Sequence, residues 1–205
     1  MTLHNHHYHY TIGTDPAAPP LLLLHGTGGN ENDLLPLARV LSPGSTVLSP
    51  RGRVSERGAN RFFARLAEGV FDLDEVTRRT HVLADFVIAA CGEHGIEAGS
   101  LIAVGFSNGA NIAASLLQLR PEVLAGAILL RPMVVLPDSA PKDSLLGKRV
   151  LIASGTQDPI VPSAHPEKLA DLLRAGGSEV SVQLFPIGHQ LTTADIMAAK
   201  DFLGS

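Results

Sequence analysis

Short apolar runs alternate along the chain with longer segments in which apolar residues recur at helical spacing. Six runs predict strands, and several of them are apolar on both faces, as buried strands of a parallel sheet are. These runs are Leu21–His25, Thr46–Pro50, Leu101–Phe106, Gly126–Leu130, Arg149–Ser154 and Val180–Phe185. The more polar run 6–12 precedes them and predicts a further strand at the edge of the sheet.

Five longer segments predict helices that follow these strands. In one of them Ala110, Ala113, Ala114 and Leu117 recur at intervals of three and four residues, which places them on one helical face. The predicted helices are Asp33–Leu41, Asp74–Cys91, Asn108–Leu119, Pro166–Ala175 and Thr193–Leu203. The alternation predicts an α/β fold, with a mainly parallel sheet flanked by helices on both faces.

Two connections, 51–71 and 131–147, are irregular in their pattern. Each follows the carboxyl end of a predicted strand, at the edge where open α/β sheets place their ligand sites. Neither is long enough to form a lid domain. We therefore expect a single domain over residues 1–205.

Composition narrows the class of protein. The 205 residues are 45% apolar and 18% charged, which is a globular composition, and a net charge of −4 does not favour a nucleic-acid partner. The one cysteine, Cys91, excludes a disulfide within the chain and fits a reducing compartment. No apolar run reaches the roughly 18 residues of a membrane span, and the polar segment 1–20 lacks a signal core. We therefore expect a cytoplasmic protein without a membrane span.

The sequence Gly-Phe-Ser-Asn-Gly at 105–109 lies between a predicted buried strand and a predicted helix. In this context Gly-x-Ser-x-Gly is the pattern of a nucleophile elbow, a tight turn that projects the serine above the sheet. Gly105 and Gly109 would have to be small because neighbouring backbone passes close to them. Ser107 is the candidate nucleophile, and the alternative is that its side chain only caps the helix.

A serine nucleophile needs a base to accept its proton, and the base needs a carboxylate that orients it. In a nucleophile-elbow fold, the acid and then the histidine follow the serine along the chain. The histidines after Ser107 are His165, at a predicted helix start, and His189, directly after the last predicted strand. Asp158 follows the preceding strand, so Ser107, Asp158 and His189 are expected at one sheet edge. Taken singly, Asp158 could belong to an ordinary Asp-Pro turn and His189 to an ordinary loop.

The glycine-rich loop 25–29 follows the first buried strand. It lacks the Lys-Ser/Thr of a P-loop and the glycine spacing of a dinucleotide site. We expect an oxyanion hole instead, formed by the main-chain N–H groups of Thr27 and of Asn108, the residue after the candidate nucleophile. His25 precedes the serine in the chain, so we expect it to hold the loop by a side-chain hydrogen bond.

Candidate substrate contacts come from the two irregular connections. Arg51 could bind an anionic substrate group, or it could belong to a solvated loop whose arginines pair with Glu56 and Glu68. The apolar candidates each have a structural alternative: Phe62 and Phe63 could line a pocket or anchor their loop, and Met133 could form a pocket wall or pack in the core.

Four histidines near the start of the chain, His4, His6, His7 and His9, could suggest a metal site. In a strand His4 and His6 would share one face, and His7 and His9 the other. No cysteine or carboxylate completes a zinc ligand set, so we expect a solvated strand edge and no metal.

Five stretches of the chain resemble the phospholipase/carboxylesterase family of α/β-hydrolases, close to its small bacterial carboxylesterases. They are 21–38, 49–72, 104–117, 153–162 and 188–192. The resemblance implies an α/β-hydrolase fold and hydrolysis of a small-molecule ester through an acyl-enzyme, without a metal or an organic cofactor. It implies Ser107, Asp158 and His189 as the catalytic triad, and it makes a homodimer plausible.

Several activities share this fold. Dienelactone hydrolases carry a cysteine at the elbow and haloalkane dehalogenases an aspartate, so Ser107 disfavours both. A carboxylesterase for small or medium acyl groups is the favoured interpretation. A thioesterase or lysophospholipase with the same triad, and a catalytically silent binding protein on the same fold, are the alternatives.

Overall fold

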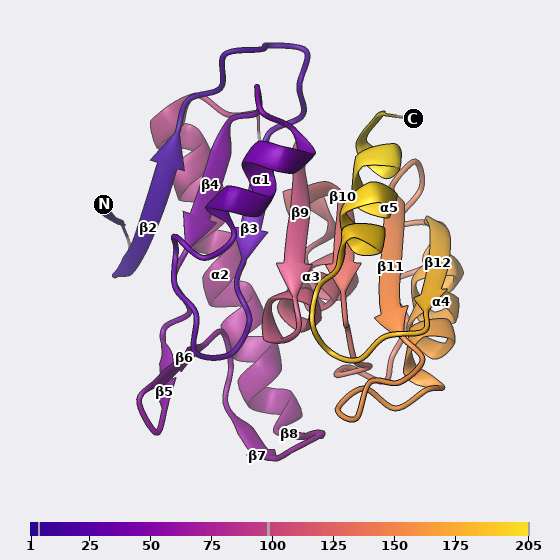
Figure 1. Ribbon diagram of the computed structural model, residues 1–205. Helices are drawn as coiled ribbons and strands as arrows, with labels where there is room; N and C mark the ends of the chain where they lie inside the picture. The colour runs from indigo at the N-terminus through magenta and orange to yellow at the C-terminus, as the bar shows by residue number, and fades with distance from the viewer. Residues whose placement is uncertain (4, 98, 205) are drawn as a thin grey trace.

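The computed structural model describes residues 1–3, 5–97 and 99–204, which form an eight-stranded central sheet with helices on both sides (Figure 1). The strand order is β1-β2-β4-β3-β9-β10-β11-β12. All neighbours from β4 to β12 are parallel, and the pairings β1–β2 and β2–β4 are antiparallel. The strands are β1 (Thr2–Leu3), β2 (His6–Thr11), β3 (Leu21–Leu24), β4 (Val47–Pro50), β9 (Leu101–Phe106), β10 (Leu124–Leu130), β11 (Arg149–Gly155) and β12 (Glu179–Phe185). The predicted mainly parallel sheet is confirmed.

The helices divide between the two faces of the sheet. Side chains of α2, α3 and α4, such as Val76, Ile112 and Leu169, belong to one buried cluster, and Ala38 of α1 and Ala198 of α5 belong to the other. The helices are α1 (Leu35–Leu41), α2 (Leu73–His94), α3 (Asn108–Leu119), α4 (His165–Ala175) and α5 (Thr193–Gly204), with a 3₁₀ turn η1 (Pro121–Val123). Figure 1 shows α1 and α5 in front of the sheet and α2 and α3 behind it.

Strand β3 explains why the predicted strands are apolar at consecutive positions. Leu22 and Leu24 belong to the cluster under α2 and α3, whereas Leu21 and Leu23 belong to the cluster under α1 and α5. Because side chains of a strand alternate between its two faces, a strand covered on both faces must be apolar throughout.

Helix α2 is longer than the predicted segment. It begins after Asp72, whose side chain accepts hydrogen bonds from the N–H groups of Asp74 and Glu75. It ends at His94 and is followed by Gly95, which has a φ of 67°. The apolar periodicity stops before the end of the helix because the last turn is exposed. The residue that marks the end of the helix is Gly95, in its left-handed conformation.

The connection 51–71, expected to be irregular, contains two β-hairpins. Strands β5 (Val54–Glu56) and β6 (Ala59–Arg61) form the first, and β7 (Arg65–Ala67) and β8 (Val70–Phe71) form the second. Strands of two or three residues are too short to leave a periodic pattern, so the sequence does not predict them. Figure 1 shows both hairpins beside the end of the sheet at which β3 and β9 end.

The histidine-rich strand β2 packs against α2. The ring of His6 stacks on Phe86 with a centroid distance of 4.4 Å, and His7 is exposed on the opposite face. His4 lies outside the described residues. Among the residues that are described, no group of three or more His, Cys, Asp or Glu is placed to hold a metal ion, and no helix is long and apolar enough to cross a membrane.

A buried ion pair ties α5 to the end of β10. The guanidinium of Arg131 donates to both carboxylate oxygens of Asp195, at 2.7 and 2.8 Å, and the two side chains are 0% and 1% exposed. Burial by itself would raise the pKa of the Asp195 carboxyl. Hydrogen bonds from Arg131 and Thr192 outweigh burial and hold that pKa below its ordinary value. The ionised form of Asp195 therefore stabilises the fold more than its protonated form would.

We expect Asp195→Asn to lower the free energy of unfolding at pH 7 by about 3–5 kcal/mol, because it leaves the Arg131 charge buried and unpaired. The folded-state pKa of Asp195 lies below its unfolded value of about 3.9, so the contribution is complete above that pH and is lost as the pH falls through the folded pKa. Urea unfolding of the wild type and the variant should therefore converge as the pH falls below about 3.9 and through the folded pKa. The control is Asp201→Asn at an exposed position of the same helix; equal stability of all three proteins at pH 7 would contradict the account.

A second prediction concerns the packing of α3 against β3. A Cβ on Gly109 would overlap the carbonyl groups of Leu24 and His25. Gly109→Ala should therefore destabilise the protein by about 1–3 kcal/mol in chemical denaturation. In contrast, a Cβ on Gly92 in α2 would meet nothing within 4 Å, so Gly92→Ala should stabilise by about 0.5–1 kcal/mol through helix propensity. A neutral effect of Gly109→Ala would mean that α3 is not packed as described.

Candidate functional site

Ser107 lies on a strained turn between β9 and α3. Its backbone has φ 52° and ψ −114°, a conformation that is rare for residues other than glycine. The turn is held by main-chain hydrogen bonds, from Ser107 N–H to Leu130 O (2.8 Å) and from Asn111 N–H to Ser107 O (2.9 Å). The Ser107 side chain makes no capping hydrogen bond to α3. The alternative that Ser107 only caps the helix is therefore wrong.

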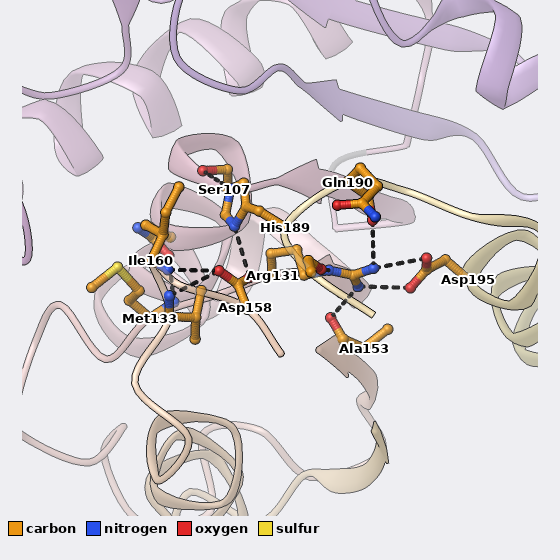
Figure 2. A network of polar contacts seen from close by, with 12 residues as sticks. Ser107, Arg131, Met133, Ala153, Asp158, Ile160, His189, Gln190 and Asp195 are labelled. Carbon is orange, nitrogen blue, oxygen red and sulfur yellow. Dashed lines mark hydrogen bonds and ion pairs between the residues drawn. The ribbon is translucent and has the colours of Figure 1, made fainter. Parts of the chain in front are cut away.

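The structure brings Ser107, His189 and Asp158 into one hydrogen-bonded chain (Figure 2). His189 Nε2 lies 3.0 Å from Ser107 Oγ, and His189 Nδ1 lies 2.7 Å from Asp158 Oδ2. A neutral imidazole satisfies both contacts when Nδ1–H donates to Asp158 and Nε2 accepts from the serine hydroxyl. The three residues follow β9, β11 and β12, and they meet because parallel strands end at the same edge of the sheet.

Asp158 is fixed by the turn in which it lies. Its side chain is 0% exposed, and its Oδ1 accepts hydrogen bonds from the N–H groups of Ile160 (2.8 Å) and Val161 (3.1 Å). The Asp-Pro turn and the contact with His189 therefore use different oxygens of one carboxylate. The turn and the contact with His189 are therefore compatible with each other.

The main-chain N–H groups of Thr27 and Asn108 are the expected oxyanion-hole donors. Thr27 and Asn108 line the same cavity as Ser107, and within the described part of the chain neither N–H has a hydrogen-bond acceptor. The buried side chain of Asn108 accepts a hydrogen bond from the Phe62 N–H at 2.8 Å. This bond joins the start of α3 to the 51–71 connection and fixes the Asn108 backbone.

His25 holds the glycine loop, as expected. Its Nε2 accepts a hydrogen bond from the Gly52 N–H at 2.9 Å, and its Nδ1 lies 2.7 Å from Gly26 O. Burial lowers the pKa of His25, which keeps its ring neutral in this position. His165 has a similar structural role, because its Nδ1 accepts from the Val134 N–H at 3.0 Å.

A cavity of about 230 Å³ opens beside the serine. It is lined by Thr27, Arg61, Arg65, Glu68, Gly69, Phe71, Phe106, Ser107, Asn108, Asn111, Met133, Ile160 and His189. Met133 is therefore at the cavity wall, which is one of the two positions that the sequence left open. The β7–β8 hairpin supplies the wall from Arg65 to Phe71, which the sequence did not identify.

Three candidate substrate residues lie elsewhere. Arg51 is not part of the cavity lining; its guanidinium binds both oxygens of Glu31, at 2.6 and 2.7 Å, and not Glu56 or Glu68 as expected. Phe62 and Phe63 are also outside the lining and are buried. The structure therefore fits the alternative that Phe62 and Phe63 anchor their loop.

Arg61 and Asn111 are two polar lining residues outside that hairpin that reasoning from the sequence also missed. Arg61 is buried, its Nη1 donates to Thr27 Oγ1 at 2.5 Å and its Nε donates to Phe63 O at 3.0 Å. Asn111 lies one turn into α3, and its Oδ1 accepts from the Met133 N–H at 2.7 Å. A polar residue on the otherwise apolar face of α3 was the available signal for Asn111, whereas no local pattern distinguishes Arg61 from the exposed arginines near it.

Similar proteins are known from several bacteria. Residues 68–205 match the Phospholipase/Carboxylesterase family. A Bacillus subtilis (strain 168) protein named "Putative hydrolase MhqD" is 47% identical over 187 residues, which are 89% of this chain and 90% of that protein. A Bacillus cereus carboxylesterase structure is 44% identical with a TM-score of 0.94, covering 97% of this chain and 93% of its own. A Mesorhizobium loti carboxylesterase structure is 35% identical with a TM-score of 0.84, and the match covers 91% of this chain and 88% of that protein's chain. The chain therefore belongs to the phospholipase/carboxylesterase family and has its α/β-hydrolase fold.

Proposed function

We propose that the protein is a serine carboxylesterase that acts through an acyl-enzyme on Ser107. The observation that carries this proposal is the chain of contacts from Ser107 Oγ through the His189 ring to Asp158, at 3.0 and 2.7 Å, beside a cavity. A base within hydrogen-bond distance of a serine hydroxyl, itself oriented by a carboxylate, is the arrangement that nucleophilic acyl transfer requires. The relatives named as carboxylesterases support the same activity.

In the proposed reaction His189 Nε2 accepts the Ser107 proton while Oγ attacks the ester carbonyl carbon. The imidazolium that forms then donates this proton to the oxygen of the leaving alcohol, and the acyl group stays on Ser107. Water attacks the acyl-enzyme by the same route, with His189 again as the base, and releases the acid. Asp158 keeps Nδ1 protonated and stabilises the positive charge on the ring.

The N–H groups of Thr27 and Asn108 are proposed to form the oxyanion hole. Both residues line the cavity beside Ser107, and neither N–H has an acceptor within the described residues. Asn108 is also the first residue of α3, so its N–H lies at the positive end of the helix dipole. Each such donor contributes about 10²–10³ in turnover in enzymes of this type.

The cavity favours a short acyl group. Its volume of about 230 Å³ is small for a ligand site, and Phe71, Met133 and Ile160 contribute apolar walls close to Ser107. A long-chain lysophospholipid would extend beyond these walls. We therefore propose small esters as substrates, with an acyl chain of a few carbons.

The proposed nucleophile is tested by removing its hydroxyl. Ser107→Ala should lower kcat for a p-nitrophenyl acetate substrate by at least about 10⁴-fold, because no acyl-enzyme can form. The control is Ser163→Ala, an exposed serine after Asp158, which should retain wild-type kcat. Full activity of Ser107→Ala would overturn the proposal. A thioester with the same acyl group, hydrolysed with a far higher kcat/KM than the oxygen ester, would assign thioesterase activity instead.

The proposed limit on the length of the acyl chain is tested at Met133. Met133→Ala should widen the cavity and raise the ratio of kcat/KM for hexanoyl over acetyl esters by about 10-fold or more, since each added methylene gains apolar contact. The main-chain bond from Met133 N–H to Asn111 is retained in this variant. Met197→Ala, at an exposed position of α5, serves as the matched control. An unchanged ratio would show that Met133 does not limit the acyl group.

A further inference from the structure

The guanidinium of Arg131 binds the main chain on both sides of His189 (Figure 2). Its Nε donates to Gly188 O at 3.2 Å, and its Nη2 donates to Gln190 O at 2.9 Å. The Arg131 side chain therefore holds the carbonyl groups of the residues directly before and directly after His189. A rigid planar group that fixes both neighbours also fixes the position and direction of the Cα–Cβ bond of His189.

All five N–H groups of Arg131 have an acceptor. Besides Gly188 O and Gln190 O, they donate to Ala153 O at 3.1 Å and to the two carboxylate oxygens of Asp195. Asp195 Oδ2 in turn accepts from the N–H and the hydroxyl of Thr192, at 2.8 and 3.0 Å. Lysine has three donors on one nitrogen, so it could not reach these five acceptors at once.

The same stretch of backbone also holds the serine. Leu130 O accepts the Ser107 N–H at 2.8 Å, and the next residue is Arg131. The Arg131 backbone has a φ of 58°, in the left-handed region, and its N–H donates to Ala153 O at 2.8 Å. This turn at the end of β10 directs the carbonyl of residue 130 to the serine turn and the side chain of residue 131 to the histidine loop.

We propose that Arg131 is a positioning residue for the reaction, which holds the 188–190 backbone so that His189 Nε2 stays within hydrogen-bond distance of Ser107 Oγ. This inference rests on the proposed function of Ser107 and His189. Arg131 does not touch the cavity, because it is absent from the cavity lining. Its effect is therefore on the placement of the base and not on substrate binding.

If Arg131 only stabilised the fold, its loss should affect kcat no more than the loss of another arginine that binds α5. Arg149 is the arginine used for this comparison. Arg149 also ties a strand to α5, because its Nη2 donates to Phe202 O at 3.2 Å and its guanidinium lies 4.7 Å from the centre of the Phe202 ring. It lies at the start of β11, at the opposite end of that strand from Asp158. Loss of Arg149 should loosen α5 without moving His189.

The experiment compares Arg131→Lys, Arg131→Met and Arg149→Met with the wild type. The first readout is ester hydrolysis, in which we expect kcat to fall about 10-fold or more for Arg131→Lys and about 10²-fold for Arg131→Met, with little change in KM. Arg149→Met should retain kcat. Arg131→Lys keeps a positive charge beside Asp195 and should remain folded, so a failure of Arg131→Met to fold does not prevent the test.

The second readout is independent of turnover. The proton on His189 Nδ1, shared with Asp158, should give a protected downfield NMR signal in the wild type and in Arg149→Met. It should broaden or disappear in Arg131→Lys through exchange with water. Wild-type kcat and an unchanged signal in folded Arg131→Lys would overturn the inference and leave the esterase proposal intact. The wild type could also hydrolyse no ester and yet show the signal, with the signal lost in Arg131→Lys. That result would overturn the proposed function while supporting the positioning of His189 by Arg131.

Discussion

The close contact between the start of α3 and the ends of β3 and β9 is the constraint on which the rest of the site depends. A Cβ on Gly105 would lie 2.5 Å from Gly109 O, and a Cβ on Gly109 would overlap the backbone of β3. The two glycines allow this contact, which forces Ser107 into a left-handed conformation between them. The strain is maintained because buried strands surround the turn on both sides. Its consequence is a serine hydroxyl at the sheet edge and a free helix N-terminus beside it.

The parallel sheet then brings distant residues to that edge. Residues 158 and 189 follow β11 and β12, and each reaches the serine from its own loop. Loops alone would leave such contacts loose, but here hydrogen bonds fix the position of each loop. Asp158 is held by two main-chain N–H groups, and the His189 loop by Arg131. The precision of the site therefore comes from polar groups packed behind it, in addition to the apolar core.

The sequence allowed the sheet and the three central residues to be predicted because their signals are local. The runs Leu21–Leu24 and Leu101–Phe106 are apolar on both faces, and Ser107, Asp158 and His189 each stand directly after a strand. Arg131 and Asp195 were not predicted as a pair, since 64 residues separate them and only the fold brings them together. The cavity wall from the β7–β8 hairpin was missed for a related reason, because strands of two or three residues leave no periodicity. Arg51 was a candidate because of its position in the 51–71 connection, but the acid that it pairs with, Glu31, comes from a different segment.

Covalent labelling is the sharpest test of whether Ser107 is an activated nucleophile. The folded protein and Ser107→Ala would be treated with a fluorophosphonate, with adducts counted by intact mass and located by peptide mapping. We expect one adduct, on the peptide that contains Ser107, and none in the variant. An unlabelled wild type, or an adduct on another residue that persists in Ser107→Ala, would contradict it.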